Sequence, residues 1–400
     1  GTPSVQTFVM KADGSGRRTV TTGFAGAGWS PTEDELTFLS DGSLIIEDAD
    51  GSHRAVIGAP FAGANEAGSV GAGGLAWSPD GRSLAFGAER WPATATSASA
   101  TNVAIPVPTG SERTYAGIWV ASADGSGARE LISAGSRPQS GFVIAGWSAD
   151  SRTVLYADNP GFAGEPGVDQ PATFLRSAIP LKAMPLAGGQ PRSLGLTAYI
   201  GTLSPSSAVD PQDEALAVVS GVGQETWTQK QIAVIAAPED TPKTLTDSSV
   251  TALSPAWSPD GSTIAFVSGA DTGEEGQAAN FASRRIWTVR ADGSLKSALT
   301  AGEGFRDEAP QWANDGLHIL FARLSVESCG PLTARIVMLN RLDGSTTEVV
   351  HSLTLTGSHD EVLVVGQVPK CPTAGISGPL IDLYGAFSLA PVFDWWQPRR

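Results

Sequence analysis

Residues 256–266 read Ala-Trp-Ser-Pro-Asp-Gly-Ser-Thr-Ile-Ala-Phe, and this phrase recurs along the chain. Its Ser-Pro-Asp-Gly step predicts a tight turn, because Pro presets φ and Gly tolerates positive φ. A first strand is expected to end at the Trp, and the β-branched and aromatic run after the turn is typical of a second strand. Related phrases occupy residues 28–40, 76–86, 146–156 and 311–321. A degenerate copy that has lost the Trp is predicted at 203–205, with its second strand at 216–219.

A second phrase alternates with the first. Residues 286–294 read Ile-Trp-Thr-Val-Arg-Ala-Asp-Gly-Ser, and similar stretches stand at 8–16, 118–127 and 336–344. Because Ala-Asp-Gly-Ser predicts another tight turn, each unit reads as four short strands. Successive copies of the first phrase place their Trp residues 48 residues apart from Trp29 to Trp77 and 55 apart from Trp257 to Trp312, close to the length of about 40–50 residues of a propeller blade. The sequence therefore predicts an all-β fold, a β-propeller of four-stranded antiparallel blades that cover one another around an axis.

The number of blades depends on how the ring closes. Six pairs of first and second strands are expected, each followed by a third and fourth strand. Residues 5–22 read as an extra third and fourth strand with no partner upstream. If these N-terminal strands pair with strands from the C-terminal segment 352–400, the chain forms one domain over residues 1–400 with seven blades. Six blades with an irregular C-terminal extension is the alternative.

The two phrases resemble the WD-like propeller repeat of the TolB family. Similar repeats occur in the propellers of prolyl oligopeptidases and dipeptidyl peptidases, and the repeat also resembles that of oligogalacturonate lyases. The resemblance covers roughly residues 5–350. It implies the propeller fold, but it leaves the function open because this repeat carries many roles. A TolB-like propeller implies a periplasmic, extracellular or cell-envelope location and a protein or peptide partner.

One rim of the propeller is expected to carry the function. The tight turns of both phrases lie at the same end of each blade, whereas the connections between second and third strands lie at the other end. Three of these connections carry long insertions, at residues 88–114, 158–177 and 269–283. Loops tolerate insertions and carry binding residues, so this rim is the predicted binding face.

The candidate binding residues flank those insertions or approach the mouth of the axis. Aromatic and Arg side chains are preferred because they are the usual anchors of protein interfaces. The predicted binding residues are Arg90, Trp91, Tyr115, Trp227, Phe281, Arg306, Asp307 and Glu308. Glu89, Glu274, Glu275, Arg284 and Arg285 flank the same insertions. For any one of them the alternative is an ordinary surface residue.

Composition narrows the classes of partner. The chain has 400 residues, a formal net charge of −15 and 41% hydrophobic residues, which excludes wholesale disorder. No basic cluster occurs, so nucleic acid is not an expected partner. No stretch approaches the about 20 apolar residues that span a bilayer. No signal peptide is visible at Gly1, as in a trimmed mature form. We expect a monomer.

Catalytic motifs are missing from the sequence. It contains no Gly-x-Ser-x-Gly elbow, no His-Glu-x-x-His and no Gly-Lys phosphate loop, and it has only four His. Residues 47–51 and 359–361 are the runs nearest to a metal or acid–base site, but an ordinary loop is the preferred interpretation of both. The recurrent Trp is interpreted as packing between blades, and the recurrent Asp as a turn residue. No catalytic residue, metal site or cofactor is predicted.

Two cysteines, Cys329 and Cys371, allow one disulfide bond. An envelope protein of the resembled family would meet oxidising conditions, so a bridge is favoured over two free thiols. Such a bridge would fasten the C-terminal tail to the sixth unit and contribute about 2–4 kcal/mol.

The function that follows is a non-catalytic propeller that binds a protein or ligand, similar to TolB-like scaffolds. A carbohydrate-active lyase or hydrolase with its site on the axis is the alternative. The two predict different sites, because an enzyme needs converging His and carboxylate groups or a metal, whereas a binding module shows mixed aromatic and charged residues.

Overall fold

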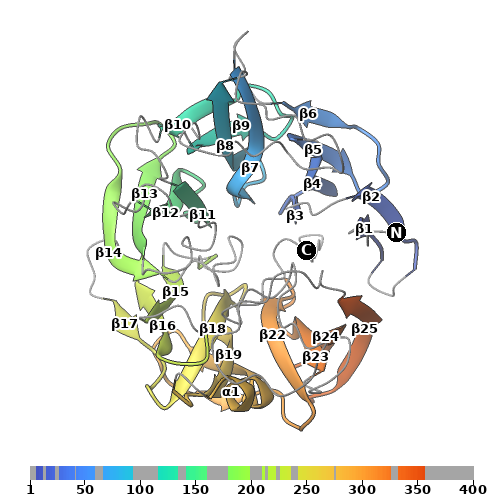
Figure 1. Ribbon diagram of the computed structural model, residues 1–400, viewed down its shortest axis with the longest axis vertical. Coiled ribbons are helices and arrows are strands. Elements are labelled where there is room, and N and C mark those ends of the chain that lie inside the picture. Colours follow the sequence, from blue (N-terminus) through green and yellow to red (C-terminus); the bar gives the residue numbers. More distant parts are fainter. Residues whose placement is uncertain are drawn as a thin grey trace.

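The computed structural model describes residues 6–11, 15–22, 27–40, 42–58, 66–92, 116–133, 141–159, 179–198, 210–211, 215–221, 226–235, 242–273, 276–325 and 332–355. Figure 1 shows the strands of this part arranged in radial sheets around a central axis. One short helix, α1 (Gln277–Ser283), accompanies them. No helix within these ranges has the length and apolar character needed to cross a bilayer. The prediction of an all-β propeller is confirmed.

The described residues form six blades, numbered here in chain order. Blade 1 contains β3 (Ala27–Trp29), β4 (Glu35–Ser40), β5 (Ser43–Asp48) and β6 (Ala55–Ile57), and blade 2 contains β7 (Glu66–Trp77), β8 (Ser83–Pro92), β9 (Ala116–Ser122) and β10 (Arg129–Ser133). Blade 3 contains β11 (Gly141–Trp147), β12 (Thr153–Asn159), β13 (Ile179–Pro185) and β14 (Arg192–Ala198), and blade 4 contains β15 (Leu216–Gly221), β16 (Lys230–Ile235) and β17 (Lys243–Thr244). Blade 5 contains β18 (Val250–Trp257), β19 (Thr263–Ala270), β20 (Arg285–Arg290) and β21 (Ser297–Ala298), and blade 6 contains β22 (Phe305–Trp312), β23 (His318–Ser325), β24 (Leu332–Asn340) and β25 (Thr346–Leu355).

Blade 4 corrects the predicted position of the degenerate repeat. In the intact turns the residue after the Trp donates its backbone N–H across the turn, as from Ser258 to the Thr263 carbonyl at 2.8 Å. The matching bond in blade 4 runs from Asp210 to Ala215 at 2.7 Å, so the turn begins at Asp210-Pro211. The second strand predicted at 216–219 is confirmed, since it lies in β15. The turn before it lies nearer to that strand than the predicted residues 203–205, because without Trp and Gly two Pro-containing steps look equivalent in the sequence. Residues 203–205 lie outside the described ranges.

The N-terminal strands occupy the ring between blades 6 and 1 (Figure 1). β1 (Gln6–Val9) and β2 (Arg18–Thr22) form a two-stranded antiparallel sheet. Val9 and Val20 pack against the buried cluster of blade 1, and Arg18 donates to the Glu47 carboxylate at 2.8 Å. Six blades are consistent with the alternative stated above, and the seven-blade closure stays a prediction. β25 covers the start of the proposed closing segment 352–400, and residues 356–400 lie outside the described part.

The recurrent Trp side chains join neighbouring blades. The indole N–H of Trp147 donates to the Ala76 carbonyl of the preceding blade at 3.0 Å, and that of Trp312 donates to the Ala256 carbonyl at 3.0 Å. Trp77 reaches the Gly28 carbonyl in the same way at 3.4 Å. In each case the acceptor is the residue before the Trp of the preceding blade. The structural interpretation of these Trp residues is therefore confirmed.

The recurrent Asp residues stabilise their own turns. Asp260 accepts a hydrogen bond from the Ser258 hydroxyl at 2.6 Å and one from the Ser262 backbone N–H at 3.1 Å. Asp80 and Asp150 accept equivalent hydroxyl bonds at 2.6 Å. These bonds confirm the turn role that the sequence predicted for Asp, since each carboxylate is engaged by its own turn.

The blades have two unlike ends. Tight turns join first to second and third to fourth strands at one end, named here the turn rim. The other connections lie at the opposite end, named the insertion rim. The insertion predicted at 269–283 joins β19 to β20 there and contains α1. The other two insertions join β8 to β9 and β12 to β13, and residues 93–115 and 160–178 within them are outside the described ranges.

Candidate functional site

Five of the eight predicted binding residues meet where blades 4, 5 and 6 adjoin on the insertion rim. Trp227 lies in the connection between β15 and β16, Phe281 lies on α1, and residues 306–308 lie near the start of β22. Arg90 and Trp91 lie at the end of β8 in blade 2, where their backbones pair with Gly68 and Ala67 of β7. Tyr115 falls outside the described residues. Hence the predicted set divides between two parts of the rim.

The backbone of β22 directs consecutive side chains to opposite faces. Side chains alternate along a strand, so Arg306 and Glu308 share one face and Asp307 points to the other. The ladder to β23 shifts register between Glu308 and Gln311, and Ala309 has a positive φ of 51°. Such a bulge separates the first half of β22 from the second half, which ends at Trp312 and packs between blades.

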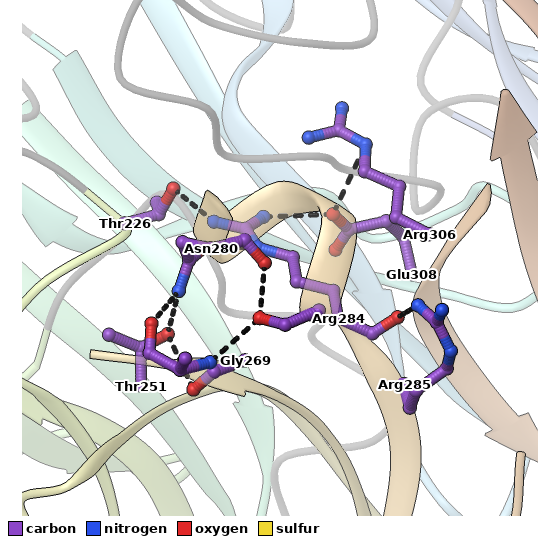
Figure 2. Close-up of polar contacts among 10 residues, drawn as sticks. Thr226, Thr251, Gly269, Asn280, Arg284, Arg285, Arg306 and Glu308 are labelled. Carbon is purple, nitrogen blue, oxygen red and sulfur yellow. Dashed lines mark hydrogen bonds and ion pairs between the residues drawn. The ribbon is translucent and has the colours of Figure 1, made fainter. Parts of the chain in front are cut away.

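A buried ion pair forms the centre of the site. Arg284 Nη1 lies 2.8 Å from Glu308 Oε1, and the two side chains are 0% and 1% exposed. Arg284 also donates from Nε to the Asn280 side-chain oxygen and from Nη2 to the Thr226 hydroxyl, both at 2.8 Å. Figure 2 shows these partners converging on one guanidinium. The charge of Arg284 is therefore matched and its donors are used.

Asn280 connects α1 to the inner strands of blade 5. Its side-chain nitrogen donates to the Thr251 hydroxyl at 2.7 Å and to the Ala270 carbonyl at 2.6 Å (Figure 2). Gly269 permits this close approach, because a Cβ there would stand 2.9 Å from the Asn280 nitrogen and 3.0 Å from Arg284 Cγ. A larger residue at 269 would displace the helix from the sheet.

Arg306 lies beside this pair but lacks an equivalent set of partners. Its Nε is 3.6 Å from Glu308 Oε1, and its residue is 2% exposed. Its Nη1 is buried with no hydrogen-bond partner in the described part of the chain. Burial lowers the pKa of Arg306 to about 10, which still leaves the guanidinium charged at neutral pH. A buried charge of this kind is costly unless something pairs with it.

Phe281 contacts both guanidinium groups. The guanidinium carbons of Arg284 and Arg306 lie 4.5 Å and 4.3 Å from the centre of its ring, which is the geometry of cation–π contacts. Trp227 contacts the same ring edge-on, with centroids 6.1 Å apart. We name this group the rim cluster; it consists of Thr226, Trp227, Asn280, Phe281, Arg284, Arg306 and Glu308.

A second ion pair occupies the opposite face of β22. Asp307, which is fully buried, accepts two bonds from Arg323, at 2.7 Å and 3.0 Å. Arg323 and Arg285 stack on Phe305, with guanidinium carbons 3.8 Å and 4.6 Å from the ring centre. Four guanidinium groups therefore gather around the start of β22, against two buried carboxylates.

The structure differs from the sequence-based expectation in the exposure of these residues. Trp227 and Phe281 are each 8% exposed, and residues 306–308 are at most 2% exposed, so they are not surface anchors. Their side chains lie below the surface of the insertion rim and pack against one another. Arg284 was expected only to flank an insertion. Thr226 carries no sequence signal because its partner Arg284 comes from another blade, and Asn280 carries none because Thr251 and Ala270, which accept its bonds, are brought to it by the folding of blade 5.

The acidic side chains of residues 47–51, considered above as a metal site, already have hydrogen-bond partners. In residues 47–51, Glu47 bonds Arg18, and Asp48 and Asp50 accept bonds from Ser52. This supports the turn interpretation of that run. Within the described ranges, no three His, Cys, Asp or Glu side chains are grouped so that they could hold a metal ion. Residues 359–361 and both cysteines, Cys329 and Cys371, lie outside those ranges.

No protein family model matches this chain, and no curated protein matches it. Solved structures do resemble it. An oligogalacturonate lyase in complex with manganese is similar over 87% of this chain and 85% of its own, with 12% identity and a TM-score of 0.52. A puromycin-hydrolyzing peptidase from Mycobacterium tuberculosis is similar over 86% of this chain, with 13% identity and a TM-score of 0.52. The match covers 51% of the peptidase, so this chain spans about half its length.

TolB from Acinetobacter baumannii is also similar, over 78% of this chain and 62% of its own, with 14% identity. Its TM-score is 0.41, which is too low to carry an argument. At such identities a likeness shows the fold and leaves the activity open. The comparisons therefore agree with the radial sheets of Figure 1, and the fold of this chain is a β-propeller.

Proposed function

We propose that this chain is a non-catalytic binding propeller that holds a protein or peptide partner on its insertion rim, across blades 4 to 6. The observation that carries the proposal is Arg306, a charged and buried side chain with an unpaired Nη1 on the innermost strand of blade 6. Only the Phe281 ring and Glu308, 3.6 Å from Nε, offset the cost of burying this charge, and an apolar residue there would avoid that cost. A partner that pairs with Nη1 would offset the rest of it.

The remainder of the rim cluster supports this role by fixing the shape of the rim. Arg284 joins α1 to the connection of blade 4 through Thr226 and to β22 through Glu308. The exposed Ala278 and Ala282 on α1 are thereby held in place relative to three blades. A preformed surface loses less conformational entropy on binding than a mobile loop does.

The finer predictions from the sequence belong to the same proposal. Arg90, Trp91 and Tyr115 would extend the binding face toward blade 2. The TolB-like repeat supports a location in the periplasm, at the cell envelope or outside the cell. We also propose that the chain is a monomer. We further propose that β1 and β2 are the outer strands of a seventh blade that residues 356–400 complete.

The test is capture of partners from the envelope fraction of the source organism, with quantification by mass spectrometry. Arg306→Ala is compared with the wild-type chain and with Arg290→Ala, whose exposed side chain lies on the turn rim of blade 5. We expect Arg306→Ala to reduce capture of a specific partner at least tenfold and Arg290→Ala to leave it unchanged. Equal capture by all three chains, capture of nothing, or release of unsaturated uronides from polygalacturonate would refute the proposal.

A further inference from the structure

We infer that Arg306 binds a single carboxylate group of the partner, at the end of a peptide or on an acidic side chain. This inference rests on the proposed function and specifies the chemistry of the same rim. It follows from three properties of the described residues: the free edge of the Arg306 guanidinium, the balance of charge around β22, and the small size of the group that can reach it.

The free edge of Arg306 has the geometry of a carboxylate receptor. Phe281 lies against one face of the guanidinium. Figure 2 shows Nε directed to Glu308 and the two outer nitrogens on the side of the guanidinium away from Glu308. Nη1 is buried without a hydrogen-bond partner in the described part of the chain, and the two outer nitrogens of a planar guanidinium match the two oxygens of a carboxylate.

Among the four guanidinium groups around the start of β22, Arg306 is the one for which the described residues supply no hydrogen-bond acceptor, since Glu308 lies 3.6 Å from its Nε. Glu308 is bonded to Arg284 at 2.8 Å, and Asp307 is bonded twice to Arg323. Arg285 donates to the backbone carbonyls of Arg284 and Phe305, at 2.6 Å and 2.9 Å, and Glu303 lies near it. Arg285 has no bonded carboxylate but uses its donors on carbonyl groups, whereas a carboxylate from outside would give Arg306 the acceptor that it lacks.

A monoanion fits this position better than a polyanion. Glu308 lies 3.6 Å from Arg306 Nε and would repel a doubly charged group such as a phosphate. The chain carries a net charge of −15, which opposes the approach of a strongly anionic polymer such as an oligouronate. The Arg306 side chain is 3% exposed, so the group that reaches it must be narrow and arrive end-on. A peptide terminus and an Asp or Glu side chain both meet that condition.

The test uses three defined pools of N-acetylated random octapeptides on the immobilised chain, with retained peptides quantified by mass spectrometry. The first pool lacks Asp and Glu and ends in a free carboxylate. The second is the same pool with amidated ends, and the third is amidated and carries one Glu at a central position. We expect at least tenfold greater retention of a carboxylate-bearing pool than of the amidated neutral pool.

Variants assign that preference to Arg306. Arg306→Gln should abolish the difference between the pools, Arg306→Lys should keep part of it, and Arg290→Gln should leave it unchanged. Circular dichroism and the midpoint of urea unfolding confirm that each variant is folded. Preference for the first pool identifies a peptide terminus as the ligand, and preference for the third identifies an acidic side chain.

Other outcomes overturn the inference in distinguishable ways. If all pools are retained equally and Arg306→Gln changes nothing, peptide binding stands and the carboxylate inference is wrong. If no pool is retained although a partner is captured from the envelope fraction, the carboxylate inference is again wrong. If neither assay shows binding, the proposed function falls as well. Retention of an oligogalacturonate that depends on Arg306 would also contradict the choice of a peptide.

Discussion

The two rims of this propeller differ in where their polar side chains find partners: mostly within one turn on the turn rim, and between blades on the insertion rim. On the turn rim the recurrent Asp residues are bonded within their own turns, as Asp260 is to Ser258 at 2.6 Å, and neighbouring turns are joined by single bonds such as Asp80 N–H to the Ser151 hydroxyl at 3.0 Å. Arg18, which bonds Glu47 and Ala49, is the exception. On the insertion rim, charged side chains from several blades are buried together. The first arrangement can be repeated around a ring, whereas the second occurs once and depends on residues far apart in sequence.

Within the insertion rim, Arg284 and Arg306 show what each kind of burial does. Arg284 has a carboxylate, an amide and a hydroxyl partner, so it holds three elements together. Arg306 has a distant carboxylate and an unpaired Nη1. Two adjacent buried arginines therefore have different expected roles, one in the fold and one in binding, and substitutions can separate them.

The largest expected effect is on Arg284. Arg284→Met should lower the free energy of unfolding by about 3–5 kcal/mol, because it leaves Glu308 without its close partner in a buried site. Arg306→Met should change that free energy by less than about 1 kcal/mol, or raise it, since an unpaired buried charge is removed. Urea denaturation measures both.

Arg335→Met is the matched control for these two variants. Arg335 pairs with Glu348 at 2.8 Å, but the two side chains are 52% and 37% exposed, so its loss should cost less than about 1 kcal/mol. If Arg306→Met proves as destabilising as Arg284→Met, both arginines are structural residues and Arg306 has no separate role in binding.

The next effect concerns the turn rim. Gly81 has a φ of +70°, and a Cβ there would stand 1.9 Å from the Thr32 hydroxyl oxygen of the neighbouring blade. Gly316 has a φ of +66° in the equivalent turn of blade 6, with no atom within 4 Å of that position. Gly316→Ala should therefore cost about 1–2 kcal/mol for the backbone alone.

Gly81→Ala should cost about 1–3 kcal/mol more than Gly316→Ala, because it adds overpacking between blades 1 and 2. Thermal and urea unfolding of the two variants measure the difference. Equal costs would mean that Thr32 moves aside freely and that neighbouring turns are less closely packed than their atoms indicate.

The sequence predicted the repeated features of this molecule better than the unique ones. Trp, Pro, Asp and Gly act within one turn or one blade contact, so their spacing alone predicts strands, turns and the ring. In blade 4 the strand at 216–219 was predicted correctly, but the turn before it was missed because Asp210-Pro211 lacks the flanking Trp and Gly. The rim cluster was predicted only in part, because Thr226, Asn280 and Glu308 meet through the fold and no spacing in the sequence relates them.

The smallest expected effect tests the bond between blades that the Trp provides. Trp147→Phe removes the 3.0 Å bond to the Ala76 carbonyl and should lower the free energy of unfolding by about 1–2 kcal/mol. Trp287→Phe is the control, since Trp287 packs partly buried in blade 5 and has no indole hydrogen bond within the described residues. Its cost should be smaller, because only packing is lost. If the two substitutions cost the same, the indole bond adds nothing to ring stability, and packing alone explains why Trp recurs at the turn end of the first strand in every unit except the fourth.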